Sequence, residues 1–570
     1  MKNLIFKIIR ITGTVLAFFN SLMFYAMRPC WSGISKTIGY GNNKPIILYY
    51  LPVIICVLFF VVLLSDLILK KIFNKNWIHI MYLSISFIFF VVVLVIIKLG
   101  AIDYMRFVWP YFFESLGYLA IILFLYFMLF CYPKMPIKDS KIFKYGILGI
   151  GCLLAVLLLA NFSINRITYD AVVYAVEDKY QIVFSTNAES IGYVEVGDKY
   201  YYDTYNGSSK KYTKVHKIEV PMNALDTAKK YTVHTKRSIY CGPFGGFLGK
   251  DITKTTNFNP VDTSDGIQYL SFSDVHMNIK QTAKTASYVD KYDFLVLAGD
   301  LISDVETFDD ANFFNRVAYD ITKGEIAVVF ARGNHDVKGR YGEELHRFVG
   351  AKGEQFYYNF YFDNIYGLVL DIGEDHDEGW WEYYGTDHYE DYRNAQLNFL
   401  NEEINKKDYE HYEYHLAVCH IPVVFVNYRK DHVHIKEEMT NLLNQMDIDM
   451  LLCGHQHDIM IFEPGLIAPN TKLTYNSNYK SGTYNGYLTD FNFPSLMISK
   501  PGYTFSDEPG LAKAKSHIGL FIDVNLAQKE ETCYYLNSRG EKVEVMNMFY
   551  EKSYGTEFKI KLDTKEFIVG

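Results

Sequence analysis

Cysteine is scarce in this chain of 570 residues, and acidic residues are almost missing from its first 164 positions. The eight cysteines form no Cys-x-x-Cys pair, which argues against a zinc ribbon or a dense disulfide framework. The chain as a whole is also not poor in apolar residues. Half of the residues are hydrophobic, which excludes a disordered or low-complexity protein. The length is that of roughly three or four domains.

The two parts of the chain differ in charge. Residues 1–164 contain 15 basic and 4 acidic residues, whereas the remainder contains 41 basic and 60 acidic residues, a net charge of −19. Binding to nucleic acid requires a basic surface. We therefore expect no general nucleic-acid binding by the acidic part.

Long apolar runs fill the first part of the chain. A helix needs about 20 residues to cross a bilayer, and ordinary soluble domains do not carry five runs of this length in close succession. The sequence predicts a membrane region, residues 1–164, with five transmembrane helices. The predicted spans are 11–27, 46–69, 78–97, 108–131 and 145–162.

Lysine and arginine favour one side of these spans. The leading segment, the second loop and the fourth loop are basic and fall on the same side if all five runs span. Basic loops stay in the cytoplasm, so we expect a multi-pass cell-membrane protein with the residues after Phe162 outside. Asp66 and Glu114 are the only acids inside the runs, and both lie near the ends. This pattern favours an anchor over a transporter.

Residues 165–261 alternate apolar and polar positions with a period of two, as half-buried strands do. The clearest stretches are 180–184, 191–196, 216–220 and 231–235. Residues 225–231 resemble the tyrosine corner of a fibronectin type III sandwich. The segment is also similar to the N-terminal sandwich domain of purple acid phosphatases. The resemblance implies an all-β sandwich that acts as a spacer.

Five strand-like runs after residue 262 each end in a polar cluster, and helical stretches such as 307–321 separate them. Strands that alternate with helices indicate an α/β sheet, which places its sites at the carboxyl ends of the strands. The runs and their clusters are 267–272 before 273–276, 294–298 before 299–300, 326–330 before 332–336, 415–419 before 420–422, and 450–453 before 454–457.

The side chains of these clusters fit a pair of metal ions. Carboxylate, imidazole and amide ligands without a thiolate suit Mn, Fe, Zn, Co or Ni. The Asp-x-His and Gly-His-x-His motifs each place two ligands at one strand end, and glycine lets the backbone turn close to the metals. Each motif alone is weak evidence, but all five in order are specific.

Together the five blocks resemble the calcineurin-like metallophosphoesterase family over about residues 266–499. The resemblance implies two sheets flanked by helices and two divalent or trivalent metal ions. The implied ligands are Asp274, His276 and His457 for the first metal, Asn334, His420 and His455 for the second, and Asp300 as the bridge. The implied proton donor is His335, with Asp304 as the residue that orients it.

Two positions depart from the purple acid phosphatase pattern. Ser303 stands where those enzymes have a metal-binding tyrosine, and His276 stands where they have glycine. The metal site therefore resembles the broader family, and a tyrosinate–iron site is not expected.

Three other residues are candidates for substrate contact. Arg332 either contacts a phosphate oxygen or forms an ion pair with a neighbouring carboxylate. The acidic and aromatic segment 373–391 is either a lid over the substrate or an ordinary solvated loop. Within it, Trp380 and Trp381 are the side chains expected to stack on a base or sugar.

The predicted domains are 1–164 (membrane), 165–261 (sandwich), 262–549 (metallophosphoesterase) and 550–570 (tail). We expect a membrane-anchored, extracytoplasmic enzyme that hydrolyses a small phosphomonoester or phosphodiester with water activated by two metals. Its expected partners are the bilayer and that substrate. The alternative is a ligand-binding or signalling membrane protein that uses the fold without turnover, and the intact ligand set argues against it.

Overall fold

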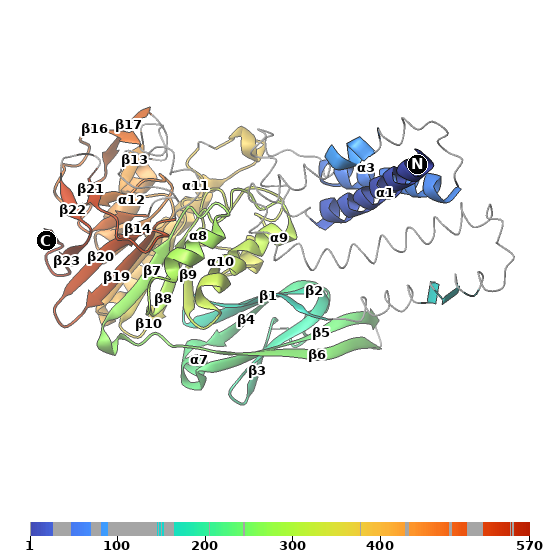
Figure 1. The fold of residues 1–570 in the computed structure, drawn as a ribbon. Coiled ribbons are helices and arrows are strands. Elements are labelled where there is room, and N and C mark those ends of the chain that lie inside the picture. Colours follow the sequence, from blue (N-terminus) through green and yellow to red (C-terminus); the bar gives the residue numbers. More distant parts are fainter. Residues whose placement is uncertain are drawn as a thin grey trace. The chain divides into compact units, whose positions relative to one another are not determined.

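The computed structural model describes residues 2–26, 47–69, several positions between 81 and 152, and most of 165–569. Within the last range it leaves out residues 205, 243–244, 377, 428–432, 478–481, 499–516, 548 and 550–551. The chain divides into two compact units, Met1–Ile164 and Asn165–Gly570 (Figure 1).

Two helices, α1 (Lys2–Ala26) and α3 (Ile47–Leu69), account for most of the described part of the first unit. They pack through apolar side chains, with the ring centroids of Phe18 and Phe60 5.3 Å apart. Helix α3 matches a predicted span to within one residue, and α1 overlaps another but begins nine residues earlier. A search of the described residues nevertheless finds no helix with the length and apolar character of a membrane span. The predicted span 108–131 lies outside the described residues, and 78–97 and 145–162 are described only in part. The five-span region therefore stays a prediction.

The described residues of the second unit form two large sheets and two small ones. The first large sheet has 13 strands in the order β24-β23-β20-β19-β7-β8-β9-β1-β2-β5-β6, with β3 and β4 also paired to β2. Its strands are β1 (Ile167–Val176), β2 (Lys179–Val196), β3 (Lys199–Tyr202), β4 (Thr213–Pro221), β5 (Lys230–Gly242), β6 (Gly245–Asn257), β7 (Ile267–Phe272), β8 (Phe294–Ala298), β9 (Ala327–Ala331), β19 (Gly519–Asn525), β20 (Glu530–Leu536), β23 (Phe558–Lys561) and β24 (Phe567–Val569).

The second large sheet has six strands in the order β10-β11-β12-β14-β18-β15. These are β10 (Tyr358–Phe362), β11 (Ile365–Leu370), β12 (Tyr414–Cys419), β14 (Met450–Cys453), β15 (Met460–Phe462) and β18 (Ser495–Met497). The small sheets consist of β13 (Phe425–Asn427), β16 (Leu473–Ser477) and β17 (Gly482–Leu488), and of β21 (Val545–Met546) and β22 (Ser553–Gly555). The helices are α7 (Met222–Ala228), α8 (Ile279–Ala286), α9 (Phe308–Ala311), α10 (Phe313–Thr322), α11 (Tyr389–Lys406) and α12 (Val433–Leu443).

The two large sheets face each other across one apolar core. Phe294 and Val296 of β8 share that core with Leu416 and Val418 of β12. Successive side chains of a strand point to opposite faces, so Leu295 lies in the second core, beneath α8 and α10. Helices α11 and α12 cover the outer face of the six-stranded sheet. The prediction of two sheets flanked by helices is confirmed.

Parallel pairing brings the polar clusters to common edges. Strands β7, β8 and β9 are parallel neighbours, and so are β11, β12 and β14. The bounds of β7, β8, β9, β12 and β14 agree with the five predicted runs to within one residue, whereas β11 was not predicted. Because parallel strands end at the same edge, the clusters that follow them lie close together.

Residues 165–261 form strands as predicted, but they do not form a separate sandwich. Strand β1 pairs in parallel with β9, where Val173 lies opposite Ala327, so the segment continues the 13-stranded sheet. Val172 and Val173, which point to opposite faces, are both fully buried. A strand buried on both faces belongs inside a layered α/β fold. The fibronectin-like, purple acid phosphatase-like domain is therefore not supported.

The predicted tail 550–570 is also part of the sheet. Strand β23 pairs with β20, and β24 pairs with β23. Phe558 and Ile560 are buried, whereas Lys559 and Lys561 are exposed. This short alternation is the pattern of a strand with one buried face, and it corrects the expectation of a tail.

A buried polar group joins the two large sheets. The Tyr414 hydroxyl on β12 donates to Glu531 Oε2 on β20 (2.9 Å) and lies 2.7 Å from the Tyr269 hydroxyl on β7. Burial raises the pKa of Glu531 to about 8, although the bond from Tyr414 opposes the shift. Glu531 is therefore neutral in the folded protein near pH 7.

We expect Glu531→Gln to flatten the pH dependence of stability. In the unfolded chain a glutamate titrates near pH ~4.3, so between that pH and about 8 the folded state holds an extra proton. The free energy of unfolding therefore decreases as the pH rises through this range. Urea unfolding should show that the variant loses about 2–4 kcal/mol less than the parent between pH 5 and 8.

The control is Glu544→Gln, which changes an exposed glutamate. It should behave as the parent does. Equal pH slopes for the parent and Glu531→Gln would mean that Glu531 is ionised in the folded protein.

Candidate metal centre

The first group of predicted ligands converges on one point. Ligand atoms of Asp274, His276, Asp300 and His457 all lie within 4.8 Å of one another. His457 Nε2 lies 3.0 Å from both His276 Nε2 and Asp274 Oδ1. The four residues follow β7, β8 and β14, so both large sheets contribute.

The remaining ligands lie beside this group. His420 Nε2 is 3.2 Å from Asp300 Oδ2, and the other ring nitrogen lies 2.7 Å from the Ala298 carbonyl oxygen, to which it donates. His455 Nδ1 is 3.1 Å from Asn334 Oδ1, and the His455 backbone N–H donates to Asp274 Oδ2 (3.0 Å). The structure thus brings all seven predicted ligands together.

Asp300, the predicted bridge, lies between the two groups of predicted ligands. Its Oδ1 accepts a hydrogen bond from the His335 backbone N–H (2.9 Å), while Oδ2 faces His420 and lies 3.8 Å from His276 Nε2. Burial would raise the pKa of Asp300, but the neighbouring histidines hold it well below its usual value. Asp336 Oδ2 accepts from the backbone N–H groups of Asp300 and Gly333, which fixes the two loops together.

The backbone at the ligands is strained. A left-handed φ is rare for residues other than glycine and costs roughly 1–3 kcal/mol each. Such strain persists where the surrounding structure enforces it. The predicted ligands with φ between 40° and 75° are Asp274, His276, Asp300, His455 and His457.

Two glycines allow the loops to approach the carboxylates. A Cβ on Gly333 would lie 2.2 Å from Asp300 Oδ1, and one on Gly454 would lie 1.8 Å from Ser273 Oγ. Both distances are far below van der Waals contact. The predicted role of glycine in these motifs is therefore visible in the packing.

These residues fit metal ions. Buried polar atoms are normally hydrogen-bonded, yet within the described part of the chain the geometry gives Asp274 Oδ1 and His420 Nε2 no hydrogen bond. Imidazole, carboxylate and amide donors that converge in this way suit Mn, Fe, Zn, Co or Ni.

His335 lies at the edge of the cluster, with 36% of its side chain exposed. Its Nδ1 lies 3.0 Å from the Ser303 carbonyl oxygen, which favours a proton on Nδ1, and Nε2 lies 4.0 Å from Asp300 Oδ2. The ring is thus oriented by a backbone carbonyl. Asp304 is buried, and its predicted role in orienting His335 stays a prediction.

Ser303 is a residue whose role the sequence did not reveal. Its hydroxyl lies 3.3 Å from His276 Nδ1, and its carbonyl oxygen contacts His335. It therefore positions two histidines at the place where a tyrosine would bind metal in purple acid phosphatases.

Arg332 takes the second of its two predicted roles. Its guanidinium donates to Asp371 Oδ2 at 2.6 and 2.8 Å and lies over the ring of Phe356, 4.3 Å from the centroid. It is therefore committed to an ion pair, and the prediction of phosphate contact is not supported.

The two tryptophans lie in the predicted lid segment. Trp380 stacks on His376, with ring centroids 4.1 Å apart, and the Trp381 side chain is exposed. Stacking of either ring on a substrate stays a prediction.

The same segment supplies two acids that lie directly behind the ligands. Asp375 Oδ2 is 3.0 Å from His455 Nε2, and Glu374 Oε1 accepts from Asn334 Nδ2 (3.4 Å). Lys338 forms an ion pair with Glu374 (3.2 Å). No role was predicted for this Glu-Asp pair from the sequence. The pair follows β11 closely, and the carboxyl end of β11 lies next to that of β12, which is the feature that could have indicated its place at the site.

Asp375 is placed to orient His455. The Nδ1 atom of His455 faces Asn334, so Nε2 is left to donate to the carboxylate. Burial would raise the pKa of Asp375, but His455 lowers it below its usual value. A carboxylate behind a metal-binding imidazole fixes the ring and raises its basicity.

Residues 267–458 match the family described as calcineurin-like phosphoesterase. This match supports a calcineurin-like metallophosphoesterase domain in that part of the chain, and with it a hydrolase. No curated protein sequence matches the chain.

Solved structures resemble the chain at low levels, and three examples illustrate this. They are the structure of PhoD (10% identity, 70% of this chain and 91% of that chain, TM-score 0.38), GAP50, the anchor in the inner membrane complex of Plasmodium (12%, 51% and 90%, TM-score 0.32), and a 5′-nucleotidase precursor from Thermus thermophilus (11%, 46% and 52%, TM-score 0.24). These similarities are too weak to bear on function.

We expect Asp375→Asn to weaken one metal position selectively. Loss of an outer carboxylate typically costs about 10–100-fold in metal affinity, and His455 is a predicted ligand of the position shared with Asn334 and His420. Titration of metal-free protein should show one of two sites weakened.

Asp391→Asn, an exposed change at the start of α11, should leave both affinities unchanged. Asp300→Asn should weaken both positions, because its carboxylate lies between them. If Asp375→Asn binds both metals as tightly as the parent does, Asp375 does not support His455.

Proposed function

We propose that the second unit, Asn165–Gly570, hydrolyses a phosphomonoester or phosphodiester at a dinuclear metal centre. The convergence of seven ligand-type side chains from two sheets, with a half-exposed histidine beside the central carboxylate, carries this proposal. The family match of residues 267–458 supports it.

Each group has a distinct part in the proposed reaction. Bound metal ions would supply an activated water and positive charge opposite the phosphoryl oxygens. Asp300 faces both positions and places a negative charge between them. His335 Nε2, which points toward Asp300 from an accessible edge, gives a proton to the departing oxygen.

A nucleophilic serine is excluded at one place that resembles a catalytic triad. Ser190 Oγ lies 2.9 Å from His216 Nε2, and His216 Nδ1 lies 2.9 Å from Asp203 Oδ2. Ser190 and His216 are fully buried, and Asp203 is almost so. No substrate can reach the hydroxyl, so this network stabilises the fold between β2 and β4.

We expect His335→Ala to lose far more activity on alkyl phosphoesters than on nitrophenyl phosphoesters. An alkoxide is a strong base and needs a proton as it leaves, and a general acid contributes typically about 10²–10⁴-fold. Nitrophenolate leaves without this help. Steady-state rates on both substrate types should be measured together with the metal content, which should not change.

The control is His411→Ala, which changes an exposed histidine after α11. This variant should keep parental rates on both substrates. An equal loss on both substrate types in His335→Ala would show that His335 binds phosphate and does not donate the proton.

The rival proposal is a binding or signalling protein without turnover. Purified full-length protein, loaded in turn with each candidate metal, should be offered monoesters, cyclic nucleotides and diesters. Metal-dependent hydrolysis of any of them rejects the rival. Tight binding of a phosphoester without hydrolysis under every condition would favour it.

We further propose that residues 1–164 anchor the protein in the cell membrane and that the second unit lies outside. The lysines of the predicted second and fourth loops support this orientation. A reporter that is active only in the cytoplasm, fused after Gly570, should be silent. The same reporter fused before Met1 should be active. The opposite pair of results would mean that the second unit lies in the cytoplasm.

A further inference from the structure

One hairpin projects from the 13-stranded sheet. Strand β2 pairs with β5 only as far as Arg237, whereas β5 and β6 stay paired to Gly242 and Gly245. Beyond Arg237, the described residues of the two strands pair only with each other, and Figure 1 shows the ribbon extending past β1 and β2. A two-stranded ribbon alone is at best marginally stable in water.

Apolar side chains are exposed on this ribbon. The exposed fractions of Ile239, Phe247 and Leu248 are 50%, 70% and 46%. The exposed ring of Tyr212 lies beside them, because its hydroxyl donates to the Cys241 carbonyl (2.6 Å). Phe247 and Leu248 are consecutive in β6 and therefore point to opposite faces of the ribbon. The end of the ribbon thus exposes apolar side chains on both faces, which favours an interaction site.

The same region is basic within an acidic unit. Residues 206–215 and 236–250 contain no aspartate or glutamate, although the chain after residue 164 carries a net charge of −19. Their cations are Lys210, Lys211, Lys214, Lys236, Arg237 and Lys250, of which Lys236 forms an ion pair with Asp251 (3.8 Å) just outside the second range. A partner for this surface must therefore offer both apolar contact and negative charge.

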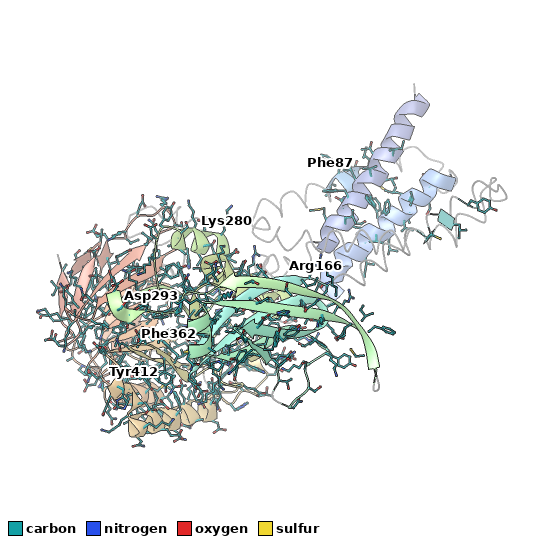
Figure 2. The ribbon with its side chains drawn as sticks, turned by 90° about the horizontal axis from the view of Figure 1, so that it is seen from below. Phe87, Arg166, Lys280, Asp293, Phe362 and Tyr412 are labelled. Carbon is teal, nitrogen blue, oxygen red and sulfur yellow. The ribbon has the colours of Figure 1, made fainter. Side chains whose placement is uncertain are left out.

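The chain enters the unit beside the hairpin. Asn165 Nδ2 donates to the Thr235 carbonyl on β5 (3.1 Å), and Figure 2 labels the next residue, Arg166. At about 3.3 Å per residue, the end of β5 lies roughly 20 Å beyond Thr235. In the proposed topology the last span ends at residue 162, so the lipid surface lies within about 10 Å of Asn165.

We infer that the hairpin tip, formed by Tyr212, Ile239, Phe247 and Leu248 with the flanking lysines, binds the surface of a bilayer that contains anionic lipids. Apolar side chains enter the headgroup boundary, and each nearby lysine adds attraction to anionic headgroups. The inference rests on the proposed membrane attachment, and it assigns the second unit a lipid contact of its own.

A release experiment separates this contact from the anchor. A specific protease sequence inserted between residues 163 and 164 of the full chain frees the second unit after folding. Co-sedimentation then measures its partition onto protein-free vesicles of phosphatidylcholine with or without phosphatidylglycerol. We expect binding to the anionic vesicles at least tenfold stronger than to phosphatidylcholine alone.

Matched variants locate the contact. Phe247→Ser/Leu248→Ser should lower the partition onto anionic vesicles at least tenfold, and Lys210→Gln/Lys211→Gln should lower it and reduce its salt dependence. Leu466→Ser/Met546→Ser removes two similarly exposed apolar side chains elsewhere and should have no effect.

Three outcomes would overturn the inference. They are a parental unit that binds neither kind of vesicle, binding that survives Phe247→Ser/Leu248→Ser, and binding to native membranes but not to protein-free vesicles, which would assign the tip to a protein partner. Phosphoester hydrolysis by the released unit is measured in parallel. Loss of hydrolysis with vesicle binding retained would contradict the proposed function alone.

Discussion

The carboxylate of Asp300 is the constraint around which the second unit is arranged. One oxygen is held by the backbone of the loop after β9, and the other faces a histidine carried by the opposite sheet. The carboxyl ends of the strands in the two large sheets must therefore lie close together, so that both sheets can reach this carboxylate. The buried group of Glu531, Tyr414 and Tyr269 connects the same two sheets within their shared core.

In this arrangement the backbone strain lies in the loops that carry the predicted ligands, whereas the buried strands stabilise the fold. Five predicted ligands adopt left-handed backbone conformations, while the strands that precede them are almost completely buried. A rigid double layer of strands can impose conformations that an isolated loop would not keep. Asp375 and Glu374 add a further constraint on side-chain orientation. They contact His455 and Asn334 from a loop that contains no predicted ligand.

The strand ends and the convergence of their polar clusters could be predicted because each apolar run is short, strongly patterned and followed at once by chemically distinctive residues. The pairing of β1 with β9 could not, because period-two alternation shows that a segment is a strand but not which sheet it joins. The role of Asp375 depends on contact across 80 residues of sequence, which no local pattern reports. For Arg332 the sequence left two partners open, and the position of Asp371 decided between them.

The pairing of β1 with β9 also limits how short a fragment of the second unit can be and still fold without an exposed sheet edge. A fragment cut at residue 262 would begin just before the family match at 267, but it would remove the neighbour of β9. The five buried residues of β9 would then form an open edge, with free backbone N–H and C=O groups beside an apolar surface. Such an edge recruits other chains, so the excised domain would aggregate although every metal ligand is present.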